Sequence, residues 1–428
     1  MAILGWEKGP GLMAGAKSFW KDQTFANVSN GIIDGLAFGI IAIPLIQKAA
    51  ASANIAPEML ESWLVSIYVG GGLISIFMGL YYKLPIAGAW SIPGAFALAQ
   101  VLGNYTFNEA VGGFFVAGLI VFLLGVTGTI KLLVAKIPIP IMMAMVAGTL
   151  FGWGAKLVES FKTAPLICAI GLAGYIICKK VLKKVPAVVG TMVFTLIGAA
   201  VLGQLNPVGI DWSIAKPMLI MPHFNFSAAL SIGIPLALLI VCAENMQAIG
   251  VQIAIGRKPP VNAMTIISGI GGLISPFFGG HNCNIAGPMT AWAGSEDCGD
   301  VDKRYVAAVW CGIIFAITGI FAKATMSVLA MLPPEATNVI IGLVLMSMII
   351  GGLEDSFGTG KFKFGNFTSF TIAVSGVVFF GIGSAFWALV AGTAITLLLE
   401  KKDYDEMKSV FEDEHFADVA LNETKEAA

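Results

Sequence analysis

One carboxylate, Glu244, stands inside an apolar run that is long enough to cross a membrane. The run is SIGIPLALLIVCAENMQAIGVQIAIG, residues 231–256, and Glu244 lies well away from both of its ends. An ionisable residue at membrane depth is costly and is by default a functional hypothesis. On a helix Gln247 shares the face of Glu244, and Asn245 lies about 100° away. These residues predict a polar site for protons and substrate, although a hydrogen-bonded packing carboxylate is the plainer alternative.

Two further titratable residues are candidates for proton coupling. Asp34 lies in SNGIIDGLAFGIIAIPLIQ, residues 29–47, towards one end of another apolar run. It either faces the same cavity as Glu244 or is a solvated residue at the mouth of that cavity. His281 follows two glycines, and histidine is the side chain that titrates closest to physiological pH. It either relays protons or is a hydrogen-bonded loop residue.

Two apolar segments, residues 83–99 and 277–294, are too rich in proline and glycine to be continuous helices. Unwound backbone at membrane depth is tolerated only where it is buried in protein or lines a water-filled cavity. Ser91 and Asn284 are good N-cap residues, so we predict half-helices that begin at these positions. Their free N–H groups and partial positive charge can hold an anion without a buried Lys or Arg. Ordinary proline-kinked packing helices are the alternative.

Several residues around these breaks are candidates for substrate contact, through polar groups or through rings that stack on a planar ligand. They are Ser91, Asn284, the backbone of Gly94, Ile285 and Ala286, and the rings of Trp90 and Trp292. Helix capping and ordinary packing are their alternatives. The six cysteines lack CxxC or zinc-type spacing, so we predict no disulfide, no metal site and no cofactor.

The chain that must position these side chains has the composition of a membrane protein. Of its 428 residues 57% are hydrophobic and only 12% are charged, and the mean hydropathy is +0.85. Soluble proteins carry about 25% charged residues. A net charge of −1 leaves no basic surface for nucleic acid. These values exclude a soluble enzyme, a nucleic-acid binder and a disordered chain, and no catalytic triad or phosphate loop indicates an enzyme within the membrane.

Apolar runs separated by charged or turn-rich breaks predict fourteen membrane spans in an all-α polytopic protein. The first seven centre near residues 38, 71, 95, 118, 147, 171 and 195, and the second seven near 238, 270, 292, 314, 345, 375 and 391. With the N-terminus inside, all of the 25 Lys and Arg residues fall on the cytoplasmic side except Lys48, Lys156, Lys162, Lys216 and Lys323. Positive residues favour the cytoplasmic side, so both termini are predicted to be cytoplasmic.

An internal repeat relates the two sets of spans. GGLISIFMG, residues 71–79, recurs as GGLISPFFG, residues 271–279, and seven of the nine positions match. Seven spans is an odd number, so the two halves have opposite topology, which is typical of an inverted-repeat transporter. Chance recurrence of small apolar residues is the alternative, but both copies occupy the same place in their half.

Three strings make the chain resemble a known transporter family. AWSIPGA (89–95), GIGSAFWALVAG (381–392) and ISPFFG (274–279) resemble the benzoate/proton symporters of bacterial inner membranes. More distant relatives are the uracil and xanthine permeases of the nucleobase–ascorbate group. The resemblance implies a fold of seven plus seven inverted spans, in which a core domain moves against a gate domain and spans 3 and 10 carry short extended stretches at the binding site.

The resemblance divides the chain into consecutive parts. We expect an interfacial N-terminus (1–23), core spans 1–4 (24–130), gate spans 5–7 (131–203), a connecting loop (204–226), core spans 8–11 (227–330), gate spans 12–14 (331–400) and a cytoplasmic tail (401–428). It also implies a protein of a bacterial or archaeal inner membrane, whose partners are the bilayer, protons and a small molecule. Relatives on this fold are often dimers, so a homodimer is expected by analogy.

Two departures from the family patterns bear on the substrate. Span 8 reads CAENMQAIG (242–250), closer to the Ala-Glu-His pattern of uracil permeases than to the Gln-Asn of benzoate symporters. Span 10 has His-Asn-Cys-Asn at 281–284, where uracil permeases carry a second glutamate. Our first hypothesis is proton-coupled symport of benzoate or a similar carboxylate, with Glu244 carrying the proton. A nucleobase symporter and a passive anion exchanger or channel remain the alternatives.

Overall fold

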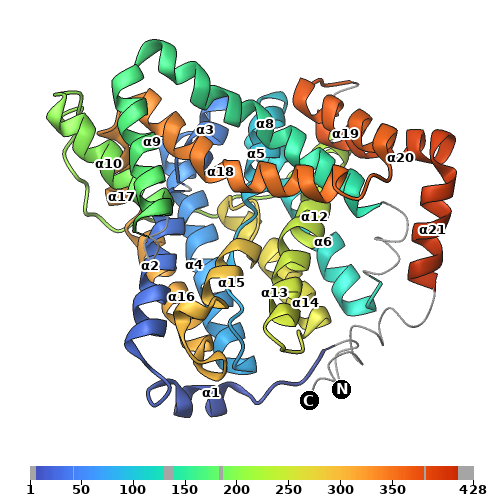
Figure 1. Cartoon of the computed structure of the whole chain (residues 1–428), viewed down its shortest axis with the longest axis horizontal. Coiled ribbons are helices and arrows are strands. Elements are labelled where there is room, and N and C mark those ends of the chain that lie inside the picture. The colour runs from blue at the N-terminus through green and yellow to red at the C-terminus, as the bar shows by residue number, and fades with distance from the viewer. Residues whose placement is uncertain (1–5, 42, 130–137, 183–186, 380–381, 413–428) are drawn as a thin grey trace.

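The computed structural model describes residues 6–41, 43–129, 138–182, 187–379 and 382–412, and these residues are almost entirely helical (Figure 1). Three features of the sequence lie outside them: the predicted boundary at 130–131, the first glycine of the 381–392 string, and the end of the predicted tail at 413–428.

The first half of the chain forms helices with recognisable capping chemistry. α6, for example, begins after a capping box in which Thr106 and Glu109 bond each other's backbone N–H. It ends at Gly128, whose φ of 66° suits glycine. The elements are α1 (Leu12–Phe19), α2 (Phe25–Ile41), α3 (Ile43–Ser52), α4 (Pro57–Tyr82), β1 (Gly88–Ala89), α5 (Ile92–Val101), η1 (Leu102–Asn104), α6 (Phe107–Thr127), α8 (Ile139–Thr163), α9 (Pro165–Lys180) and α10 (Ala187–Val201).

The second half opens with a long helix that two π-helical segments, η2 and η3, widen. Its elements are α11 (Phe226–Ala228), η2 (Ala229–Gly233), α12 (Ile234–Leu238), η3 (Leu239–Asn245), α13 (Met246–Ala254), α14 (Val261–Ile274), η4 (Ser275–Phe278), β2 (Asn284–Ile285), α15 (Gly287–Ala293), η5 (Glu296–Cys298), η6 (Val301–Lys303), α16 (Tyr305–Ile320), α17 (Ala322–Ala330), α18 (Pro334–Phe357), α19 (Lys363–Ser375), α20 (Ser384–Leu399) and α21 (Lys401–Glu412).

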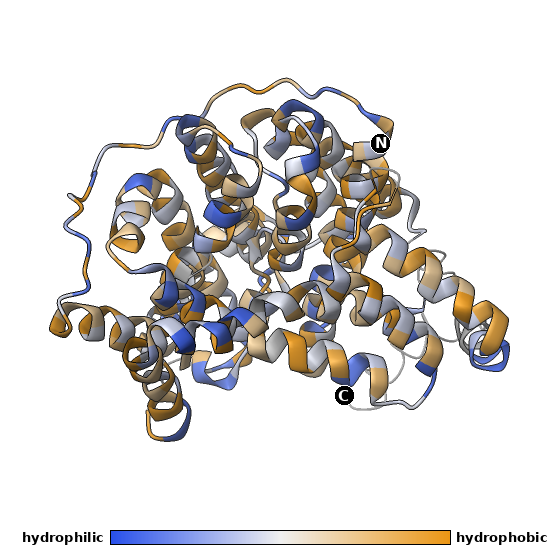
Figure 2. Ribbon diagram, turned by 90° about the horizontal axis from the view of Figure 1, so that it is seen from above, coloured by the Kyte–Doolittle hydropathy of each residue, from blue (hydrophilic) through white to orange (hydrophobic). Residues whose placement is uncertain are grey.

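Within the described residues, 7 helices are long and apolar enough to cross a membrane. The bent pair of α17 and the start of α18, with 113° between its parts, makes up to 8. Many large apolar side chains are exposed to the outside of the protein. Hydrophobic residues, orange in Figure 2, occur along most of the helices. Every predicted span centre falls inside a described helix, whereas α17 was not predicted. The total of fourteen spans stays a prediction, because several of these helices are short or broken.

The helices pack in two groups. α4 packs on α16, α16 on α2, and α6 on α14 and η2, whereas α8 packs on α18 and α19, α9 on α10, and α19 on α20. In Figure 1 the first group fills the lower part of the molecule, and α8 and α18 cross its upper part. The broken segment with α5 and the η3 segment both contact α8, so they lie where the two groups meet.

Equivalent glycines of the two repeat copies make equivalent contacts. A Cβ at Gly71 would lie 2.6 Å from Cα of Ala89 in β1, and a Cβ at Gly271 would lie 2.2 Å from the carbonyl oxygen of Cys283, just before β2. The next glycines, Gly72 and Gly272, leave similar room for α16 and α6 respectively. The repeated glycine pair is therefore needed for close helix packing and for two extended strands that run against the helices.

Candidate functional site at the two broken helices

The two breaks lie where the sequence predicts them, and they pair with each other. β1 and β2 form an antiparallel pair in which Gly88 faces Ile285 and Ala89 faces Asn284. The backbone N–H groups next to the strands are bonded by side chains of the flanking helices. Gly88 N–H donates to Ser75 Oγ at 2.9 Å. Strand pairing and side chains of the flanking helices together bond the backbone N–H groups of this segment deep in the protein.

Ser91 caps α5 as predicted, but Asn284 does not cap α15. The Ser91 hydroxyl accepts the Gly94 N–H at 3.0 Å. The N-cap of α15 is Ala286, because Asn284 is already paired with Ala89 in the strands. The prediction of a half-helix that begins at Asn284 was therefore wrong. A non-local strand pairing overrides the local capping preference of asparagine.

His281 is buried inside the loop before β2, and both of its ring nitrogens have partners. Its Nδ1 accepts the indole N–H of Trp63 at 3.0 Å. The other nitrogen, Nε2, lies 3.3 Å from the carbonyl oxygen of Ser91. Because Nδ1 is an acceptor, the neutral ring carries its proton on Nε2 and donates it to Ser91. This geometry favours a histidine that positions the start of α5 rather than one that faces a cavity.

Glu244 lies in the π-helical segment η3, between the starts of α5 and α15. It is 1% exposed, and its Oε2 accepts the backbone N–H of Gly287 at 3.1 Å. The backbone N–H of Ile92 also interacts with the carboxylate. Its other oxygen, Oε1, has no hydrogen-bond partner among the described residues. π-Helical turns are frequent at functional sites, and here the wide turn places an incompletely bonded acid at both broken helices.

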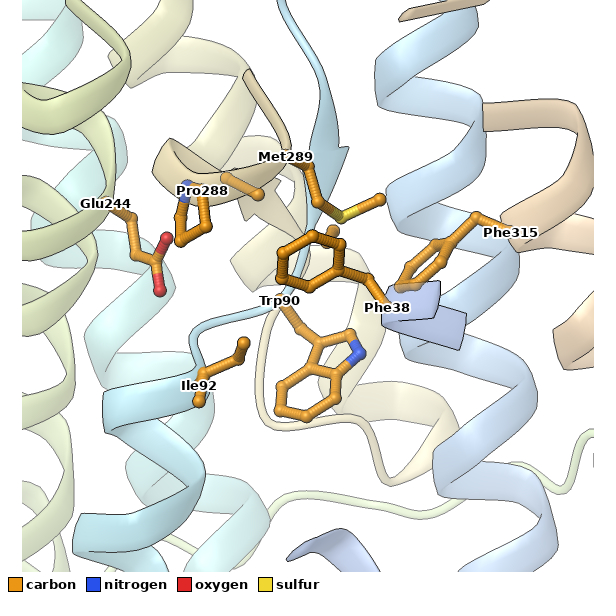
Figure 3. Close-up of a pocket in the computed structure, with 9 residues that line it drawn as sticks. Phe38, Trp90, Ile92, Glu244, Pro288, Met289 and Phe315 are labelled. Carbon is orange, nitrogen blue, oxygen red and sulfur yellow. The ribbon is translucent and has the colours of Figure 1, made fainter. Parts of the chain in front are cut away.

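A narrow cavity of about 10 Å³, roughly the space of one water molecule, adjoins this carboxylate. Its walls come from both breaks and from α2 and α16, and they are Phe38, Ala89, Trp90, Ile92, Glu244, Ala286, Pro288, Met289 and Phe315. Figure 3 shows the carboxylate on one side and the rings of Phe38, Trp90 and Phe315 on the other. Ligand sites are mostly apolar with a few placed polar groups, and typical volumes begin at about 300 Å³. The lining therefore suits one small ring with one polar substituent, and the cavity must widen to admit such a ligand.

The remaining backbone candidates have partners of their own. The N–H of Gly94 bonds Ser91 Oγ, that of Ile285 bonds Ser268 Oγ at 3.0 Å, and that of Ala286 bonds the carbonyl of Ala87 at 2.9 Å. Ala286 nevertheless lines the cavity. In this structure the backbone N–H groups that meet an acid in the site are therefore those of Gly287, at 3.1 Å, and Ile92.

The polar neighbours of Glu244 divide into one buried residue and one exposed residue. Asn245 is buried, and its Oδ1 accepts the hydroxyl of Ser268 at 3.0 Å. Gln247 is exposed and lies directly against Gly287, where a Cβ would meet its Oε1 at 2.4 Å. Gln247 thus stands beside Gly287, one of the two backbone donors of Glu244.

Asp34 and Trp292 lie apart from the cavity. Asp34 is on α2 beside the thiol of Cys311, one helical turn from the cavity residue Phe38. The indole N–H of Trp292 reaches Asn30 Oδ1 at 3.4 Å, one further turn along α2. Neither residue lines the cavity.

Sequence reasoning missed most of the apolar wall. Phe38, Phe315 and Met289 are ordinary apolar residues on helices, and no local signal distinguishes them from packing residues. Pro288, directly after the Gly287 donor, was noted only as a helix breaker. No group of three or more metal-ligating His, Cys, Asp or Glu side chains occurs in the described part of the chain.

Known proteins resemble this chain over most of its length. The family profile described as "Benzoate membrane transport protein" (BenE) matches residues 22–398. The benzoate membrane transport protein of Acinetobacter baylyi is 28% identical over 355 residues, covering 83% of this chain and 90% of that protein. The inner membrane protein YdcO of Escherichia coli is 29% identical over 356 residues, covering 83% and 91% respectively.

Solved structures share the fold at low sequence identity. The transmembrane domain of a cyanobacterial bicarbonate transporter, BicA, superposes with a TM-score of 0.56 at 13% identity, covering 86% of this chain and 98% of that domain. The structure of SLC26A9 superposes with a TM-score of 0.59 at 12% identity, covering 90% of this chain and 67% of that one. The fold is therefore a helical membrane-transporter fold.

Proposed function

This chain belongs to the benzoate membrane transport protein family, and on that premise we propose that it is a proton-coupled symporter of benzoate or a similar small aromatic carboxylate. It is an integral membrane protein and a transporter, not an enzyme. Family membership supports a membrane transporter, and the proposal adds the identity of the substrate and the coupling to a proton.

The observation that carries the proposal is the carboxylate of Glu244 on the backbone N–H of Gly287, at the wall of an aromatic-lined cavity. A substrate carboxylate would need the same kind of donor, and its ring would need apolar walls. The cavity supplies Trp90, Phe38 and Phe315 for the ring. The donor, however, is already taken by an acid of the protein itself.

We therefore propose that the substrate carboxylate and the ionised Glu244 compete for the Gly287 N–H. When Glu244 binds a proton, its hydrogen bond weakens and its charge no longer repels a second carboxylate. The substrate then accepts the N–H, while the protonated Glu244 stays beside it. After the site opens to the other side, Glu244 loses its proton, regains the N–H and expels the substrate. One proton thus travels with one carboxylate.

The architecture that we propose for this cycle is the fourteen-span inverted repeat. The group containing α4, α6, α14 and α16 acts as the core domain, and the group containing α8, α9, α18 and α19 acts as the gate. We place both termini in the cytoplasm of a bacterial or archaeal cell and expect a homodimer by analogy with the fold. The packing of the helices in two groups supports this division.

The test is the initial rate of uptake of labelled benzoate into proteoliposomes, with and without an inward proton gradient. Because benzoic acid crosses bilayers unaided, protein-free liposomes give the background that is subtracted. We expect gradient-stimulated uptake that other aromatic acids compete and that uracil and xanthine do not. Competition by nucleobases would replace the substrate assignment with a nucleobase. Uptake that ignores the proton gradient would favour the passive anion exchanger.

A further inference from the structure

Asp34 is a second buried acid, and the proposed cycle leaves it unused. It is 0% exposed, and among the described residues its only hydrogen-bonding neighbour is the weakly donating thiol of Cys311. Buried polar groups that serve structure are almost always hydrogen-bonded. An unpaired charge in such a place is very costly, so the carboxyl is neutral in this state and holds a proton. A packing role does not account for a buried acid whose one partner is a weakly donating thiol.

The helices around Asp34 seal it on both sides along α2. A Cβ at Gly31 would lie 2.4 Å from the carbonyl oxygen of Ala307, and a Cβ at Gly35 would lie 2.7 Å from that of Cys311. α2 and α16 are therefore in backbone contact just before and just after Asp34. Such close packing excludes water from the carboxyl in this conformation.

The ionisable groups that face Asp34 carry no positive charge to pair with it. They are the thiol of Cys311 on α16 and the thiol of Cys298 on η5. The nearby guanidinium of Arg304 is directed elsewhere, because its nitrogens donate to the carbonyl oxygens of Gly294 and Gly299 at 2.7 and 2.8 Å. A proton is therefore the counter-charge that fits this site.

Asp34 stands between the cavity and one surface of the protein. One helical turn towards the cavity is Phe38, which lines it, and one turn the other way is the half-buried Asn30, whose side chain contacts Trp292. Positions 30, 34 and 38 share one face of α2. The excess of Lys and Arg residues on one side of the predicted spans predicts that the Asn30 end of α2 faces the cytoplasm. Phe38 therefore separates Asp34 from the cavity, and Asn30 separates it from the cytoplasmic side.

We propose that Asp34 binds a second transported proton, which it takes from the cavity past Phe38 and releases to the cytoplasm past Asn30. The proposal rests on the proposed function, in which Glu244 carries the first proton. One proton with one carboxylate anion moves no net charge. Two protons with one anion move one positive charge, so the second site makes transport electrogenic.

The experiment measures benzoate-evoked current on a supported proteoliposome membrane, together with labelled benzoate uptake by the same preparation. Passive benzoic acid carries no charge, so it gives no background current. We expect the wild-type protein to give an inward positive current and Asp34→Asn to keep uptake while losing that current. Uptake without current in the wild type, or an undiminished current in Asp34→Asn, would overturn the proposal.

A control aspartate and a second chemical measurement complete the design. Asp302, an exposed acid that pairs with Arg257, is changed to Asn and is expected to keep both signals. If Asp34→Asn does not fold, a hydrophobic carbodiimide is applied to the wild-type protein without substrate, because this reagent modifies protonated carboxyls in apolar surroundings. A mass-spectrometric adduct on Asp34 supports the proposal, and an adduct on Glu244 alone overturns it. This arm also decides the role of Asp34 if benzoate proves not to be the substrate.

Discussion

Replacing Glu244 with Gln removes the proton carrier while keeping the shape of the side chain. The Gln carbonyl can still accept the Gly287 N–H, which the carboxylate accepts at 3.1 Å. It cannot ionise, so it is a weaker competitor for that donor and does not change with pH. We expect Glu244→Gln to bind benzoate, to exchange it across the membrane, and to lose all response of net uptake to a proton gradient.

The size of the effect follows from the two kinds of hydrogen bond. A bond to a charged group contributes about 1.5–3 kcal/mol and a neutral one about 0.5–1.5 kcal/mol. In the variant, the side-chain hydrogen bond to Gly287 that benzoate must displace is therefore weaker than the bond of ionised Glu244 by roughly 1–1.5 kcal/mol. This difference corresponds to about tenfold tighter benzoate binding. A gradient of one pH unit supplies about 1.36 kcal/mol to a one-proton symporter. The variant gains none of this driving force.

The assay compares benzoate affinity at several pH values and gradient-stimulated initial rates, after subtraction of protein-free liposomes. Wild-type affinity is expected to weaken as the pH rises through the titration of Glu244, whereas the affinity of Glu244→Gln stays constant and is about tenfold higher at alkaline pH. Glu354→Gln changes an exposed glutamate near the end of α18 and serves as the matched control. Gradient-stimulated uptake by Glu244→Gln would refute the competition.

Two other outcomes are expected. In Gly287→Ala the new Cβ would lie 2.4 Å from Gln247 Oε1, so we expect folded protein with strongly reduced benzoate uptake, and normal uptake would contradict this account of the site. Burial raises the pKa of Asp22, but a hydrogen bond from Tyr305 and the charge of Lys83 outweigh burial and lower that pKa. We therefore expect Asp22→Asn to be less stable than the wild-type protein in thermal unfolding at pH 7. This difference in stability should disappear as the pH falls below 3.8, because Asp22 of the wild type then becomes protonated.

Local chemistry was the part of the structure that the sequence predicted well. Ser91 caps α5 because its hydroxyl bonds a backbone N–H only three residues along the chain, which is a purely local pattern. The breaks at β1 and β2 follow from proline and glycine in the same way. Glu244 was found because an acid inside a long apolar run stands out in any sequence.

Contacts between distant segments were not visible in the sequence. Asn284 has the right chemistry for an N-cap, but its pairing with Ala89 could be found only by bringing the two halves together. His281 bonds Trp63, 218 residues away, a contact that favours a positioned loop residue and that no local pattern reveals, while its role as a proton relay stays a prediction. The aromatic wall of the cavity is likewise made by residues whose local patterns are those of packing.

The pairing of β1 with β2 constrains how the site can work. Each strand is the unwound part of one broken helix, and the Ala286 N–H donates across the pair to the carbonyl oxygen of Ala87 at 2.9 Å. Serine hydroxyls of α4 and α14 bond the N–H groups of Gly88 and Ile285. Pulling the strands away from each other and from these helices would leave buried backbone groups without partners, which is costly in the membrane. The N–H of Gly287 and the carboxylate of Glu244 therefore stay on one body throughout the cycle. Between the inward-open and outward-open conformations, the access of water and protons to this part of the protein changes. Coupling must therefore depend on which acid is charged when the site opens to each side of the membrane. On this reasoning a variant that loosens β1 from α4, such as Ser75→Ala, which removes the acceptor for the Gly88 N–H, should lower uptake and exchange together. The proton dependence of the residual uptake should stay unchanged. Loss of proton dependence with normal exchange would show that the strands themselves move.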